Sequence, residues 1–112
     1  MVDVVLTKQR IEPSETDRLR EWCTEIRERE TEALATLRDE GMREEAAFVE
    51  SDDEGDYLVY FMKADDIDAV YEAFEESDHA IDEAHKAVMR DVLVSGENVA
   101  EYELLYHLTT SK

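Results

Sequence analysis

Apolar residues recur along this chain with two spacings, a two-residue period typical of strands and a three-to-four-residue period typical of helices. Residues 2–11 are rich in β-branched residues and predict a strand, which Pro13 ends. Residues 19–37 then carry apolar side chains at helical spacing. They predict one long helix, with Ser14 as its N-cap and Gly41 just beyond its end.

Two strands joined by a polar hairpin loop follow this helix. The first, over residues 42–50, alternates, and the alternation places Met42, Ala46 and Phe48 on one face. The second, over residues 57–62, is apolar on both faces. We therefore expect this second strand to be covered on both sides.

The last third of the chain predicts two short helices and a final strand. Either Asp65 or Asp66 can cap the first helix, and residues 77–78 separate it from the second. Residues 95–96, a Ser-Gly pair, end the second helix. Clean alternation over residues 100–108 then predicts a strand.

The order of these elements is β-α-β-β-α-β, with the second helical region split in two. This order predicts a single α+β domain over residues 1–112, a ferredoxin-like fold with a four-stranded antiparallel sheet. Right-handed crossovers place the strands over 2–11 and 57–62 in the centre of the sheet. The helices cover one face only. We therefore expect a homodimer whose sheets face one another as a dimeric α/β barrel.

The net charge of the chain indicates the ionic environment in which the protein works. The chain has 31 acidic against 12 basic residues among 112, a formal net charge of −19, over an ordinary apolar fraction of 43%. Such a charge destabilises the compact state by self-repulsion, which molar salt screens. The composition therefore indicates a salt-adapted protein. It also argues against nucleic acid and anionic membranes as partners, because both are polyanions.

The single cysteine, Cys23, excludes an intrachain disulfide and favours a reducing compartment. Neither a signal peptide nor a run of about 20 apolar residues is present. We therefore expect a cytoplasmic location.

A family resemblance supports the same fold. It is carried by the runs DYLVYFMKADD (56–66) and FEESDHAIDEAHK (74–86), by Trp22, and by Leu104 to His107. These segments resemble a small uncharacterised family of prokaryotic, haloarchaeal-like proteins of unknown function. Their layout is similar to that of the dimeric α/β-barrel superfamily, which includes monooxygenase-like and mutarotase-like proteins. The resemblance implies the dimeric barrel and supplies no catalytic residues, because this chain lacks the tryptophan pair of the mutarotases.

Four side chains are candidate ligand-binding residues: Tyr60, His79, His85 and His107. His85 falls on an apolar helical stripe, where it is either a core histidine or a titratable group in a pocket. Tyr60 and His107 are polar points that could face a cavity, and both also suit simple packing. The spacing of Asp82 and His85 allows either shared ligation of a metal or an acid–base pair. We expect neither a metal nor a cofactor.

Two functions remain open. The first is a non-enzymatic binding or accessory protein, and we favour it because no motif requires chemistry. The second is a small-molecule enzyme or ligand binder that uses barrel-end histidines and tyrosines. An interior cavity that contains a histidine would favour the second, and a filled interior would favour the first.

The charge pattern predicts that the melting temperature rises between dilute buffer and molar KCl. The reason is that the Debye length falls to about 3 Å at 1 M salt, which removes most of the repulsion among the acidic side chains. Calorimetry across a KCl series measures this rise. An unchanged melting temperature would rule out salt adaptation.

Overall fold

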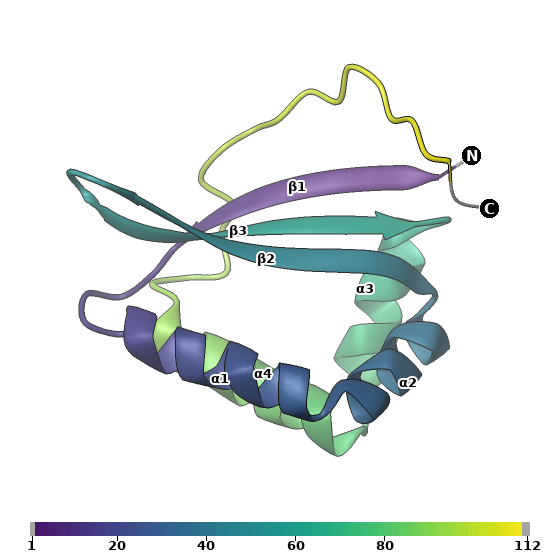
Figure 1. The fold of residues 1–112 in the computed structure, drawn as a ribbon, viewed down its shortest axis with the longest axis horizontal. Helices are drawn as coiled ribbons and strands as arrows, with labels where there is room; N and C mark the ends of the chain where they lie inside the picture. Colours follow the sequence, from purple (N-terminus) through teal and green to yellow (C-terminus); the bar gives the residue numbers. More distant parts are fainter. Residues whose placement is uncertain (1, 111–112) are drawn as a thin grey trace.

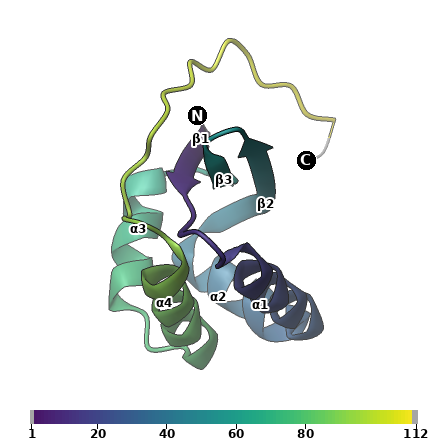
Figure 2. The same ribbon diagram turned by 90° about the vertical axis from the view of Figure 1, so that its left-hand side faces the viewer.

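The computed structural model describes residues 2–110 and has an α+β architecture with one sheet and four helices (Figure 1). In chain order the elements are β1 (Asp3–Arg10), α1 (Thr16–Glu28), α2 (Glu30–Glu40), β2 (Met42–Asp52), β3 (Gly55–Ala64), α3 (Ile67–Glu76) and α4 (Ala80–Val92). All four helices lie on one side of the sheet (Figure 2). The predicted α+β class is confirmed.

The sheet has the strand order β1-β3-β2, and both pairings are antiparallel. Leu58, Tyr60 and Met62 of β3 face the helices, because they belong to the clusters that pack there. Tyr57, Val59 and Phe61 therefore face the opposite side. We call this second side the open face, since no helix covers it (Figure 2).

The predicted strand over residues 100–108 does not join the sheet, so the described residues form a three-stranded sheet with β1 at one edge. The chain follows β1 only briefly after α4. Val94 N–H donates to Arg10 C=O at 3.0 Å, and Val99 N–H donates to Lys8 C=O at 2.7 Å. Residues 99–110, here called the C-terminal arm, then pass over the open face without regular structure. Alternation of apolar and polar residues places side chains on the two faces of a strand. Joining a sheet also requires the edge of another strand with which to pair.

The prediction of a single long helix after Pro13 was wrong in two respects. The helix divides at Arg29, which has the non-helical dihedrals φ −109° and ψ 37°. Its sequence signal is the two-turn gap between Ile26 and Ala33, where no apolar side chain holds the helix to the core. Ser14 is not the N-cap either. It adopts a left-handed φ of 72° in the preceding turn, and Glu15 occupies the cap position without a side-chain bond.

Three local signals were interpreted correctly. The Asp66 carboxylate accepts from the N–H groups of Asp68 and Ala69, at 3.1 and 3.2 Å, and so caps α3. Gly41 ends α2 in a left-handed conformation with φ 85°. The two strands after it form a hairpin, although they extend further than predicted and leave a tight turn at residues 53–54.

A bulge at the start of β2 shows that one prediction, that Met42, Ala46 and Phe48 share a face of this strand, was wrong. The register shifts between Met42 and Glu44, so that Met42 packs into the helix-facing core. Ala46 and Phe48 pair with Phe61 and Val59 and lie on the open face. Met42 therefore does not share a face with them, because the extra residue inverts the alternation.

The helices contact the sheet through two separate hydrophobic clusters. One lies near the start of α1 and the end of α4 and contains Ile11, Leu19, Leu58, Val92 and Leu93. The other lies near the start of α3 and contains Met42, Met62, Ala64 and Val70. Tyr60 packs against both clusters. The two layers are thus joined at two ends.

The capping geometry predicts that Asp66→Ala lowers the free energy of unfolding by about 1 kcal/mol, because two N–H groups of α3 lose their acceptor. Urea denaturation in molar KCl measures this loss. Asp65→Ala is the matched control, since it removes only an exposed ion pair with Arg43 and should cost less than about 0.5 kcal/mol. Equal losses in both variants would contradict the assignment.

Candidate functional site

A cavity of about 830 Å³ lies between the helices and the sheet. Apolar side chains from both layers form most of its wall, among them Trp22, Leu37, Met62 and Phe74. Polar side chains enter it from α2, β2, β3 and α4. Its volume falls within the roughly 300–1,000 Å³ of small-molecule sites. The interior is therefore not filled by packing.

His85 is held in one orientation at the wall of this cavity. Trp22 Nε1–H donates to His85 Nδ1 at 2.9 Å, and Phe74 contacts the imidazole edge-on with ring centroids 5.8 Å apart. Burial lowers the pKa of His85, against the opposing effect of Asp82. The ring is therefore neutral at pH 7, and since Nδ1 accepts, the proton lies on Nε2. No partner for Nε2 is found within residues 2–110, so this donor is available to a bound molecule.

Two carboxyl groups meet at one hydroxyl on the floor of the cavity. Thr36 Oγ1 lies 2.9 Å from Glu40 Oε2 and also hydrogen-bonds Asp82 Oδ2. Ser77 donates to the same Asp82 oxygen at 2.5 Å. Thr36, Glu40 and Asp82 are all buried, with 4%, 8% and 4% of their surfaces exposed.

This arrangement requires a proton on one carboxyl group. The Thr36 hydroxyl has one hydrogen and can donate to only one of its two neighbours. The second contact is a hydrogen bond only if the other carboxyl carries a proton. Burial, together with Asp82 and Glu45, raises the pKa of Glu40 to about 7. We therefore assign the proton to Glu40.

A second acid–hydroxyl pair stands on the sheet side of the cavity. Tyr60 donates its phenolic hydrogen to Glu45 Oε2, across the β2–β3 pairing. Burial raises the pKa of Tyr60 well above its ordinary value, and the Glu45 carboxylate adds to this effect. Partial burial of its carboxyl group also raises the pKa of Glu45, although the residue as a whole is exposed. The cavity thus combines neutral donors with carboxyl groups that resist ionisation.

The structure brings together two of the four predicted site residues. Tyr60 and His85 both line the cavity. His79 lies outside it at the start of α4, where its Nε2 is 2.8 Å from Asp39 Oδ2, a contact that raises the pKa of His79. His107 belongs to the C-terminal arm, beyond the open face. Asp82 and His85 do not form the suggested pair, because their hydrogen bonds go to other residues.

Sequence reasoning named Asp82 but missed the other two acids of the cavity, Glu40 and Glu45. Ala33, Thr36, Leu37 and Glu40 occupy positions i, i+3, i+4 and i+7 of one helical stripe. An acid at the end of an apolar stripe is a readable signal of a buried carboxyl. Glu45 gave no such signal, because the bulge at the start of β2 decides which face it occupies.

Within residues 2–110 no group of three histidine, cysteine or acidic side chains is arranged to hold a metal ion. In the same range no helix combines the length and the apolar character that crossing a bilayer requires.

The fold and the cavity define a small α+β protein with a polar site between its two layers. The chain belongs to DUF6176, a family of unknown function whose model matches residues 2–112. The expectation of an uncharacterised family is confirmed. No curated protein and no solved structure matches the chain.

The raised pKa of Glu40 predicts a pH-dependent effect of Glu40→Gln on stability. With a native pKa of about 7 against an ordinary 4.5, the wild-type protein is stabilised by this group below pH 4.5 and loses that contribution as the pH rises through 7. Glutamine resembles the protonated acid. We therefore expect similar free energies of unfolding at pH 5 and an advantage of about 1–3 kcal/mol for Glu40→Gln at pH 8.

Urea denaturation of both proteins at the two pH values measures the difference. Glu30→Gln, at an exposed position of the same helix, is the matched control and should show no pH-dependent advantage. A constant difference between wild type and Glu40→Gln at the two pH values would show that Glu40 titrates as an ordinary glutamate.

Proposed function

We propose that this protein binds a small molecule in the cavity between its helices and its sheet. The observation that supports this function is the cavity itself, about 830 Å³ in volume and lined by the neutral His85 beside buried carboxyl groups. Polar groups in an apolar interior cost free energy. Such a cost is typical of binding and catalytic sites, where these groups meet a ligand.

The lining favours a compact, mainly apolar ligand with a basic nitrogen. Its apolar part would lie against Trp22 and the methionine side chains of the wall. Its nitrogen would lie near Glu45 and Glu40, which offer carboxylate or carboxyl oxygens. Charge inside such a site is screened less by salt than charge on the surface, so this attraction would persist in molar salt.

A second candidate function is proton-transfer catalysis in the same cavity. It is favoured by the pKa of Glu40 at about 7, since a general acid or base works best when its pKa is near the working pH. Tyr60 and the Nε2–H of His85 would then orient the substrate. His79 and His107 are left out of both versions of the site, because neither lines the cavity.

We further propose that the chain works as a homodimer in a salt-rich cytoplasm. The apolar residues of the open face, among them Leu6, Val59 and Phe61, support a second sheet lying against it. A facing pair of sheets, each completed by a fourth strand, would give the dimeric α/β barrel and the ferredoxin-like topology of that superfamily. The net charge of −19 supports the salt-rich environment.

The proposed ligand class predicts different responses to three probes of equal size: cyclohexylamine, cyclohexanol and cyclohexanecarboxylate. In molar KCl the amine should raise the melting temperature most, because only it carries a cation to the carboxyl groups. Glu45→Gln should weaken amine binding about tenfold, a free-energy loss of about 1.4 kcal/mol. Thermal-shift titration and NMR chemical-shift mapping measure both effects.

Glu44→Gln is the matched control, because it removes the same charge from the neighbouring residue, which faces the opposite side and pairs with Lys63. It should leave amine binding unchanged. Failure of all three probes to perturb resonances of cavity residues would contradict the proposed function. Tighter binding of the carboxylate than of the amine would contradict the ligand class.

A further inference from the structure

The C-terminal arm exposes apolar side chains to an unusual degree. Leu104, Leu105, Tyr106 and Leu108 are 53%, 81%, 76% and 82% exposed. These residues belong to the segment with the clearest strand-like alternation in the chain. A contiguous exposed apolar segment of this kind marks an interaction surface.

An unpaired sheet edge lies beside the point where the arm begins. Lys8 and Arg10 of β1 direct their backbone groups toward the outer edge, since their carbonyls accept from Val99 and Val94. Alternate residues of a strand direct their N–H and C=O groups to the same edge. Leu6 and Val4 therefore present donors and acceptors there, and no partner for them is found in the part of the chain that the structure describes.

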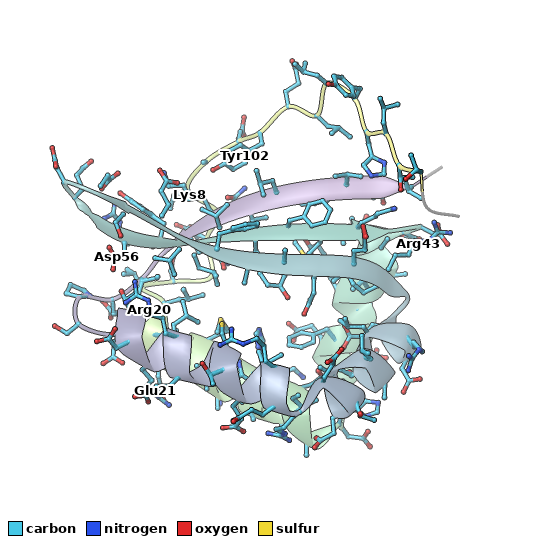
Figure 3. All side chains as sticks on the ribbon, viewed as in Figure 1. Lys8, Arg20, Glu21, Arg43, Asp56 and Tyr102 are labelled. Atoms are coloured by element: carbon cyan, nitrogen blue, oxygen red, sulfur yellow. The ribbon has the colours of Figure 1, made fainter. Side chains whose placement is uncertain are left out.

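The arm does not continue along this edge. Figures 1 and 2 show that it leaves β1 and crosses above the open face toward the side of β2. Tyr102 lies on the same side of the sheet as Lys8 (Figure 3). Within residues 2–110 of one chain, the edge of β1 at Val4 and Leu6 is thus unpaired, and the apolar side chains of the arm remain largely exposed.

The surface beside this free edge is apolar. Leu6 and Phe61 are cross-strand neighbours on the open face, and Phe48 on the same face is 57% exposed. The lysines of this face are already paired within one chain, Lys8 with Glu50 and the buried Lys63 with Glu44. A strand that carries leucines, such as the arm, would extend this apolar surface.

We propose that the arm of each chain packs on a second copy of the same chain, as a strand along the free edge of its β1. A strand added to an open edge gains backbone hydrogen bonds, and a reciprocal exchange of two identical arms closes a two-fold dimer. The proposal rests on the homodimer proposed above. It is independent of the cavity ligand.

The test compares dimer dissociation constants of full-length variants by sedimentation in about 1 M KCl. Leu105→Glu and Leu108→Glu alter side chains that a single chain leaves exposed, so the fold of the subunit is retained. We expect each to raise the dissociation constant at least tenfold. Leu34→Glu is the matched control on α2, at a leucine that is 39% exposed and outside the proposed contact, and it should leave the constant unchanged.

Hydrogen exchange provides the second measurement. Amides of residues 99–108 should become protected as the protein concentration rises through the dissociation constant. Unchanged dimerisation in both arm variants would overturn the arm exchange while leaving the facing-sheet dimer intact. Protection of the arm amides that does not depend on protein concentration would also overturn the arm exchange, because it would indicate pairing within one chain. A monomeric wild-type protein would overturn the arm exchange and the homodimer together, and ligand binding in the cavity would be unaffected.

Discussion

The separation of the two layers is the constraint on which the rest of this structure depends. The helices contact the sheet through one cluster around Leu19 and Val92 and a second around Met42 and Val70. Between these clusters the layers do not close on one another, and Tyr60 is the side chain that reaches both. A continuous apolar core would have filled the interior. Contact at two ends instead leaves a cavity of about 830 Å³ in a chain of 112 residues.

The acidity of the chain has different physical consequences outside and inside. Most of its 31 acidic residues are solvated, and their repulsion depends on ionic strength. Glu40, Glu45 and Asp82 line the cavity, and for Glu40 and Glu45 removal from water penalises the charged form. The hydroxyl groups of Thr36 and Tyr60 offset part of this cost. The part of the desolvation cost that is not offset raises the pKa of Glu40 to about 7. A carboxyl group with such a pKa can accept or donate a proton near neutral pH.

Local patterns predicted the local structure well and the long-range structure in part. Three strands, the hairpin, the Asp66 cap and the end of α2 at Gly41 follow from residue type and spacing. The bulge after Met42 does not, because it depends on how two strands pair, and the break at Arg29 was missed although the apolar gap between Ile26 and Ala33 marks it. The strand over residues 100–108 needs a partner edge that alternation cannot supply. For the site, helical position singled out His85 and Asp82, whereas Glu40 and Glu45 were recognised only once the layers were placed in space.

A site-resolved NMR titration of the Glu40 side-chain carboxyl carbon tests the central claim most directly. The claim is that the interior holds a protonated carboxyl group beside Thr36 and Asp82 in an unfilled cavity. A titration midpoint of about 7 in the folded protein is the result expected. A midpoint near the ordinary glutamate value of 4.5 would mean that Glu40 is well hydrated, and would contradict both the proton assignment and the desolvated polar site.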